Sequence, residues 1–241
     1  LNWGCIPTKA LLKNAEILNY VNSSHKYGIN VGNVSFDFKL NIERSRNVAS
    51  RLSKGIEFLI KKNNIVHIDG FGKLTAEKEI LVEKEESSEK IHAENIIIAT
   101  GARPKKISGL TLDGKRLISS KNALELKTVP KKMVIIGSGA IGCEFAYYYN
   151  SFGSEVHIIE LSDRILPLED FEVSKELEKS FIGKGIKVST STKVIKAEGL
   201  KSKVKILIES NGTKTYIDSE IALVAIGVTG NIKNIGLNSR Y

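Results

Sequence analysis

Residues Val134–Glu144 read VIIGSGAIGCE and carry the strongest indication of the fold. This stretch contains the pattern G-x-G-x-x-G, formed by Gly137, Gly139 and Gly142, after an apolar run and before an expected helix. The first glycine permits a tight turn, the second lets the backbone approach a pyrophosphate, and the third allows close packing of helix on strand. Free N–H groups at the helix N-terminus bind phosphate. The stretch therefore predicts a dinucleotide-binding unit.

A carboxylate, Glu160, follows the glycine loop at the end of the next expected strand, 155–160. A carboxylate in this place accepts hydrogen bonds from ribose hydroxyls and repels a 2′-phosphate, so it favours NAD over NADP. The alternative is an unrelated strand-end carboxylate, which the glycine loop and its strand–helix–strand frame disfavour. The nucleotide-binding residues expected here are Gly137, Ser138, Gly139, Ala140, Ile141, Gly142 and Glu160.

The spacing of apolar residues predicts two different halves of the chain. The first half has expected helices at 8–24 and 37–62, the second of them with Asp37 as N-cap, and short strands at 65–68, 72–75, 80–82 and 91–99. After a linker, the second half has expected strands at 132–136, 155–160, 186–189, 193–198, 204–208, 214–217 and 221–226, and helices at 140–152 and 171–184. This alternation predicts an α/β unit with antiparallel strands and a return.

The composition is that of an ordinary globular chain, with 241 residues, 41% hydrophobic and 26% charged. The net charge of +9 comes from scattered lysines, so we expect no nucleic-acid partner. No apolar run reaches the roughly 20 residues of a membrane helix, so we expect no membrane partner and see no signal peptide. The two cysteines, Cys5 and Cys143, make neither a disulfide scaffold nor a metal site. We expect Cys143 to be a packing residue.

A second motif lies at Leu1–Leu12, which reads LNWGCIPTKALL. Cys5 stands before an expected helix, and a helix N-terminus lowers the pKa of a thiol and raises its reactivity. Taken alone, however, this position favours a small buried apolar residue over a reactive thiol.

The motif resembles the redox signature of the pyridine nucleotide-disulfide oxidoreductases, Cys-Leu-Asn-x-Gly-Cys-x-Pro-Ser/Thr-Lys, and follows it from Leu1 through Lys9. The resemblance implies that a first cysteine immediately precedes Leu1 and attacks the substrate disulfide. It implies that Cys5 faces the flavin and forms the charge-transfer thiolate. The resemblance extends over the whole chain and covers about half of a family member, so we expect an internal piece that lacks both ends.

Other positions match the family as well. Lys9 and Glu144 match an ion pair beside the flavin N5, where a lysine stabilises negative charge on reduced flavin. The turns at 100–102 and 225–227 match the places where the chain leaves and re-enters the FAD domain. The resemblance thus implies catalytic roles for Cys5, Lys9 and Glu144. It implies cofactor contacts for Lys9, Gly72, Ala99, Thr100, Gly101, Ala102, Glu144, Val194 and Gly227.

The implied fold is α/β, with a Rossmann-like NAD-binding domain at 107–228 inserted in a partial FAD-binding domain at 1–106 and 229–241. The implied cofactors are FAD and NAD. The implied activity is the oxidation of dihydrolipoamide, carried on a lipoyl domain, to lipoamide with reduction of NAD. The implied partners are a 2-oxo acid dehydrogenase complex and a second copy, joined through a C-terminal domain. The implied location is the bacterial cytoplasm or the mitochondrial matrix.

Two alternatives stay open at the level of sequence. One is a related reductase of the glutathione or mercuric type. Glutathione reductases carry arginines near the position of Glu160, and a mercuric reductase has an additional C-terminal cysteine pair. The wording Cys-Ile-Pro-Thr-Lys favours the dihydrolipoamide branch, although Val228 and Thr229 stand where many relatives have Arg and Pro. The other alternative is an inactive fragment that binds NAD without turnover.

Overall fold

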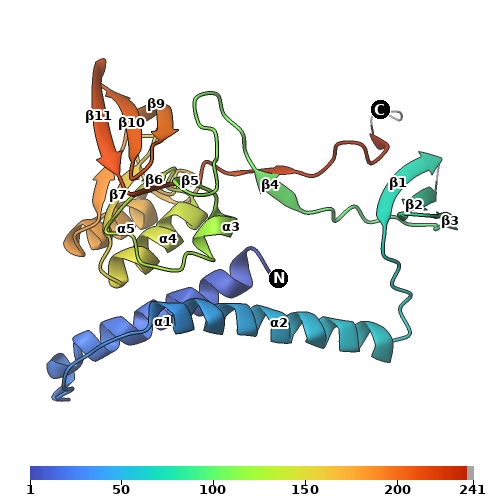
Figure 1. The fold of residues 1–241 in the computed structure, drawn as a ribbon, viewed down its shortest axis with the longest axis horizontal. Coiled ribbons are helices and arrows are strands. Elements are labelled where there is room, and N and C mark those ends of the chain that lie inside the picture. The colour runs from blue at the N-terminus through green and yellow to red at the C-terminus, as the bar shows by residue number, and fades with distance from the viewer. Residues whose placement is uncertain (77, 238–241) are drawn as a thin grey trace. The chain divides into compact units, whose positions relative to one another are not determined.

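The computed structural model describes residues 1–76 and 78–237, so the end of the expected return segment, 238–241, lies outside the described residues. The chain forms two compact units, which Figure 1 shows as ribbons. Unit 1 comprises Leu1–Lys54 and Pro104–Gly227, and unit 2 comprises Gly55–Arg103 and Val228–Tyr241. The functional domain boundaries at 106 and 228 stay a prediction.

The helices are α1 (Cys5–Asn22), the 3-10 helix η1 (Ser24–Tyr27), α2 (Phe38–Lys62), α3 (Ser120–Ala123), α4 (Ala140–Ser151) and α5 (Phe171–Gly183). The strands are β1 (Phe71–Ala76), β2 (Glu79–Glu83), β3 (Ser88–His92), β4 (Ala102–Pro104), β5 (Leu117–Ile118), β6 (Lys132–Ile136), β7 (Glu155–Ile159), β8 (Lys187–Ser189), β9 (Thr192–Gly199), β10 (Val204–Ser210), β11 (Thr213–Ser219), β12 (Ile221–Val224) and β13 (Val228–Gly230). Among the described residues, no helix is both long and apolar enough to cross a membrane.

Unit 1 is built on a five-stranded sheet in the order β5-β12-β6-β7-β8, in which every neighbouring pair is parallel. The succession β6–α4–β7–α5–β8 is the expected strand–helix alternation. The central strand β6 is buried from Met133 to Ile136, as a strand covered on both faces must be. The α/β class predicted from the sequence is therefore confirmed.

The two faces of this sheet belong to two separate hydrophobic cores. Because side chains alternate along a strand, Met133 and Ile135 lie on the face that packs against the helices, together with Phe145 of α4. Val134 and Ile136 lie on the opposite face, in a cluster that holds residues of β9 and β10. Figure 1 shows the corresponding layers, with α3, α4 and α5 on one side of the sheet and β9–β11 on the other.

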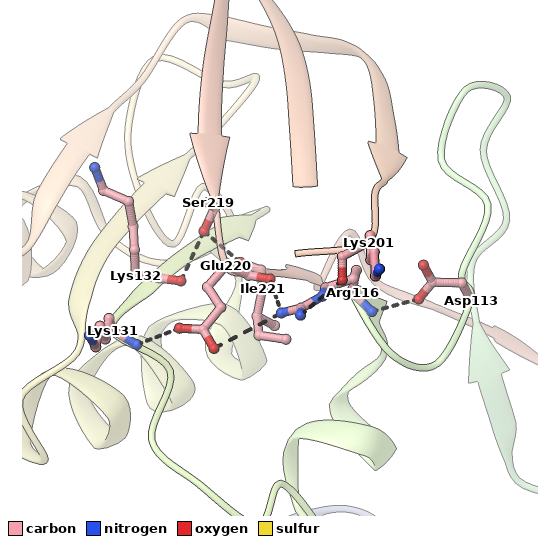
Figure 2. A network of polar contacts seen from close by, with 8 residues as sticks. All are labelled: Asp113, Arg116, Lys131, Lys132, Lys201, Ser219, Glu220 and Ile221. Carbon is pink, nitrogen blue, oxygen red and sulfur yellow. Dashed lines mark hydrogen bonds and ion pairs between the residues drawn. The ribbon is translucent and has the colours of Figure 1, made fainter. Parts of the chain in front are cut away.

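The second cover is an antiparallel sheet in the order β11-β10-β9. The chain passes from this sheet to the parallel sheet between β11 and β12, and hydrogen bonds hold the connection in place, as Figure 2 shows. The Ser219 hydroxyl bonds the Lys132 carbonyl (3.0 Å), and the Glu220 carboxylate accepts the Lys131 N–H (2.9 Å). Arg116 donates to the carbonyls of Glu220 (3.1 Å) and Lys201 (3.3 Å). The chain thereby changes sheets within two residues.

Helix α1 packs against α4 inside unit 1. It begins at Cys5, three residues before the expected start, because Pro7 lies in the first turn, where a helical N–H has no acceptor in its own helix. Helix α2 begins as expected, with the Asp37 carboxylate accepting the Leu40 N–H at 3.0 Å. Its first residue, Phe38, packs among aromatic side chains of α4.

Unit 2 contains two small sheets. Strands β1, β2 and β3 form an antiparallel sheet, and β4 pairs with β13. Asn231 closes the second pairing, since its N–H donates to the Gly101 carbonyl (3.0 Å) and its side chain donates to the Thr100 carbonyl (3.1 Å). Segments far apart in the sequence, on either side of the intervening strands, are thus joined at the expected exit turn.

Two expected strands were wrong in unit 2. Residues 65–68 form no strand, and the strand expected over 91–99 ends at His92. Both segments have the apolar run of a strand, but within the described part of the chain no strand pairs with them, and a strand exists only through such pairing. Ile97 is accordingly 91% exposed and Val66 81% exposed. In unit 1, the expected linker holds the short elements β5 and α3, which the sequence pattern did not indicate.

Candidate functional site: a glycine loop beside a redox-type cysteine helix

The glycine loop lies between β6 and α4, against the end of β12. Gly137 has a φ of +97°, a region that glycine enters freely. A Cβ on Gly137 would stand 2.6 Å from the Ala225 carbonyl oxygen, and a Cβ on Gly142 would overlap the Gly137 carbonyl oxygen. The chain itself therefore requires these two glycines, one for the turn and one for the contact of helix and loop.

Gly139 differs from its two neighbours. It caps α4 without any side-chain hydrogen bond to the first turn. A Cβ built on it would meet nothing within 4 Å. The fold alone does not require glycine here, and the open space lies before the positive end of a helix. The residues present thus fit the phosphates of a dinucleotide, which would need the space that a side chain would fill.

Glu160 directly follows β7 and is only 8% exposed. Its Oε2 accepts the N–H (2.8 Å) and the hydroxyl (2.7 Å) of Ser138, and its Oε1 accepts the Ser162 N–H (2.8 Å). Burial alone would raise the pKa of this carboxyl, but the bonds from Ser162 and Ser138 outweigh it and hold the pKa below its usual value. The side chain is therefore a fixed anion beside the glycine loop.

The cysteine helix meets the nucleotide helix through an ion pair. Cys5 is exposed at the first position of α1, and Lys9 follows one turn later. The Lys9 ammonium donates to the Glu144 carboxylate of α4. The pKa of Lys9 is raised, first by this hydrogen bond and also by the charges of Glu144 and Cys5, against an opposing effect of burial. The structure thus forms the expected ion pair, while its place beside a flavin stays a prediction.

The remaining expected residues divide between the units. In unit 1, Val194 lies in β9 opposite Ile208, and the carbonyl of Gly227 accepts the Lys105 N–H at 3.0 Å. In unit 2, Gly72 lies in β1 opposite Val82, and the turn at 99–102 carries the Asn231 contacts described above. Their roles toward cofactors stay predictions.

Besides the bond from Ser138 to Glu160, sequence reasoning missed three features of the site. Ser162 supplies a backbone donor to Glu160, and its residue type gives no signal for this bond, because every residue except proline has a backbone N–H. The Cys143 thiol donates to the Ser138 carbonyl at 3.2 Å, so it has a bonding role besides packing. Two cations lie over the Trp3 ring, Arg46 at 4.7 Å and Lys121 at 4.2 Å from its centroid. These contacts join the segment before α1 to α2 and α3, so no local sequence pattern predicts them.

Comparison with known proteins agrees with this geometry. The profile of the pyridine nucleotide-disulphide oxidoreductase family matches residues 1–240. Dihydrolipoyl dehydrogenase of Chlorobaculum tepidum is 43% identical over 99% of this chain and 51% of its own length. The enzyme of the same name from Zymomonas mobilis is 42% identical over 99% of this chain and 52% of its own length. The chain spans about half the length of the curated relatives it matches.

Solved structures share the fold. LpdA from Mycobacterium tuberculosis has a TM-score of 0.88 at 22% identity, with 98% of this chain and 52% of that chain covered. RclA, an HOCl-induced flavoprotein disulfide reductase from Escherichia coli, has a TM-score of 0.76 at 27% identity, with 97% and 49% covered. Dihydrolipoyl dehydrogenases and related disulfide reductases depend on FAD and NAD, so the predicted cofactors are those of the family. The chain belongs to the pyridine nucleotide-disulphide oxidoreductases, a family of oxidoreductase enzymes.

Proposed function

We propose that the full-length protein oxidises dihydrolipoamide, carried on a lipoyl domain, to lipoamide, with FAD as prosthetic group and NAD⁺ as acceptor. The observation that carries the proposal is the ion pair between Lys9 and Glu144, which joins the cysteine helix to the nucleotide helix. The relatives named dihydrolipoyl dehydrogenase support the choice of substrate. The fixed anion at Glu160 supports NAD over NADP, because it repels a 2′-phosphate.

The proposed thiol chemistry uses Cys5 in a disulfide with a cysteine that precedes Leu1. One substrate thiolate attacks the sulfur of that preceding cysteine and displaces the Cys5 thiolate. The second substrate thiolate then breaks the mixed disulfide, so lipoamide leaves and two cysteine thiols remain in its place. The Lys9 ammonium, one turn from Cys5, stabilises the displaced thiolate, and Glu144 keeps that ammonium in position.

Bound cofactors would accept the electron pair from the cysteines and deliver it as hydride to NAD⁺. In this proposal the loop 137–142 binds the NAD pyrophosphate, Glu160 accepts from the adenosine ribose, and Val194 lies near the adenine. Lys9 and Glu144 lie at the flavin ring. The other proposed FAD contacts are Gly72, Ala99, Thr100, Gly101, Ala102 and Gly227.

The proposal includes the organisation expected from the family. An NAD-binding domain at 107–228 is inserted in an FAD-binding domain, and two copies form a homodimer. The dimer serves a 2-oxo acid dehydrogenase complex in the bacterial cytoplasm or the mitochondrial matrix. The relatives support both locations, because they include bacterial and mitochondrial enzymes.

The test is a pair of measurements on the purified full-length protein. The visible absorption spectrum should show a flavin, and dihydrolipoamide with NAD⁺ should give turnover. Glutathione disulfide or Hg²⁺ with NADPH should give at most about a hundredth of that rate, since the glutathione and mercuric types use other substrate contacts. A flavin with the opposite substrate preference would replace the proposal by one of those types. A colourless protein that binds NAD without turnover would contradict the enzyme assignment.

A further inference from the structure

Ser138, the residue between the first two glycines of the loop, is completely buried. Both of its donors, the backbone N–H and the hydroxyl, reach the same carboxylate oxygen, Oε2 of Glu160, at 2.8 and 2.7 Å. Neither bond is required by the turn, which Gly137 makes through its own backbone. Ser138 therefore does something besides forming the loop, and what it contacts is the expected ribose-binding carboxylate.

Ser138 is itself held from the other side. Its carbonyl accepts the Leu166 N–H at 3.0 Å and the Cys143 thiol at 3.2 Å. Burial, together with the charges of Glu160 and Glu144, raises the pKa of Cys143 to about 12. The thiol therefore keeps its proton at neutral pH and stays a donor. Contacts from α4 and from the segment after β7 thus fix the position of Ser138.

These bonds occupy the two oxygens of the Glu160 carboxylate unequally. A carboxylate offers about four acceptor positions. Ser138 fills both positions on Oε2, and the Ser162 N–H fills one on Oε1. The remaining donor to this carboxylate is the half-buried hydroxyl of Ser162, which also forms a hydrogen bond with it. A ribose hydroxyl can replace this single rotatable donor, whereas a 2′-phosphate has no proton to donate and meets a fixed negative charge.

We propose that Ser138 is the positioning residue that sets selectivity for an unphosphorylated adenosine ribose, by fixing Oε2 of Glu160 so that Oε1 is the oxygen that a ribose hydroxyl can reach. The inference rests on the proposed NAD function. Without the serine hydroxyl, Oε2 regains an open position and is held by one backbone N–H alone, so the carboxylate is less firmly fixed. The preference for a free ribose hydroxyl then falls, while the overall charge of the site does not change.

The test compares ADP-ribose with 2′-phospho-ADP-ribose by calorimetric titration of the full-length flavoprotein. These probes carry the ribose without the nicotinamide, so no hydride transfer disturbs the measurement. We expect Ser138→Ala to reduce the preference for ADP-ribose about tenfold, the size of one hydrogen bond to a charged group. Ser138→Gly, which also removes the hydroxyl, serves if the alanine variant does not fold.

The matched control is Ser154→Ala. Ser154 is also buried, but among the described residues its hydroxyl has no hydrogen-bond partner. This variant should keep the preference of the wild type. An equal loss of affinity for both probes in Ser138→Ala, or no change, would overturn the inference and leave the proposed function in place. Failure of the wild type to bind ADP-ribose would instead overturn the proposed NAD function.

Discussion

Two helices of unit 1 both begin after a glycine N-cap, but the residues around one N-terminus are buried and those around the other are exposed. Helix α4 has Gly139 as its N-cap and α1 has Gly4, and neither cap makes a side-chain hydrogen bond. At α4 the neighbouring groups are buried and bonded to each other, as in the contact of Ser138 with Glu160. At α1 Cys5 is exposed, and its neighbour Lys9 has a side chain 62% exposed.

The difference separates two ways of preparing a helix N-terminus for chemistry. The nucleotide end is preorganised by the protein interior, because buried donors and close backbone contacts fix its shape before any ligand binds. The redox end is formed at the surface, by the Lys9–Glu144 pair and by the contacts of Arg46 and Lys121 with the Trp3 ring. Exposed contacts of this kind contribute little to stability. Substitutions in the close backbone contacts of the first end should therefore change folding, and those at the second end should change chemistry.

The largest effect is expected at the redox end. Cys5→Ser should lower dihydrolipoamide turnover at least about a thousandfold, because the hydroxyl forms no disulfide. ADP-ribose binding should stay at the wild-type level. The control is Cys143→Ser, in which a hydroxyl replaces the buried thiol as donor to Ser138, and turnover should remain near that of the wild type. Turnover in Cys5→Ser above a tenth of the wild-type rate would contradict the role of Cys5.

The glycines give the next effect, at the nucleotide end. Gly142→Ala should destabilise the protein by about 3 kcal/mol in urea unfolding, because its Cβ would overlap the backbone of Gly137. Gly139→Ala should change stability by less than about 1 kcal/mol, since its Cβ meets nothing, but should weaken ADP-ribose binding about tenfold. An equal loss of stability in the two variants would contradict the different roles of Gly142 and Gly139.

Acid should weaken the sheet under the nucleotide end. Burial, and then the nearby Lys187 and Lys132, lower the pKa of His157 in β7 to about 4. Between this value and the unfolded value of about 6.5, the unfolded chain binds more protons, so stability falls as the pH falls. From pH 7 to pH 5 this one group should account for a loss of about 2 kcal/mol.

The measurement is urea unfolding of the wild type and of His157→Gln at several pH values. The variant should show a flatter dependence between pH 7 and pH 5, because the amide does not titrate and still reaches the Ser189 hydroxyl, now 2.8 Å from His157 Nε2. Parallel curves for the two proteins would show that His157 does not titrate as a buried group.

The smallest effect on stability is expected at the Lys9–Glu144 pair. Glu144→Gln should change the free energy of unfolding by less than about 1 kcal/mol, as other exposed ion pairs do. Turnover should nevertheless fall about tenfold, because Lys9 loses the charge that holds it. The control is Glu155→Gln, which breaks the exposed pair between Glu155 of β7 and Lys132 of β6. A loss of turnover in both variants would mean that the effect is one of surface charge.

Local patterns predicted the parts of the fold that local chemistry determines. The apolar run before Gly137 predicted β6, and Asp37 predicted the start of α2. The segments 65–68 and 96–99 have equally apolar runs but form no strand, because strand formation depends on a partner that the run itself does not specify. β5, with only two residues, is too short to show any periodicity.

In the candidate site, too, local patterns predicted some contacts and not others. The glycine loop and Glu160 stand in one strand–helix–strand unit, so their spacing alone indicated a shared site. Lys9 and Glu144 lie 135 positions apart, and only resemblance to a family linked them. The bond from Ser138 to Glu160 escaped prediction for a different reason: the direction of a hydroxyl depends on the backbone of the loop, which the spacing of residues does not report.

The parallel sheet of unit 1 acts as a partition. Ile135 and Ile136 are neighbours on one strand, yet each takes part in a different core. A void on the helix side cannot be filled by side chains from the antiparallel side, because the hydrogen-bonded backbone of five strands lies between them. Each side therefore has to achieve close packing by itself. A substitution that alters side-chain volume must therefore be accommodated within its own core. Each core is a thin layer, so each accepts a smaller change in volume than one continuous interior would.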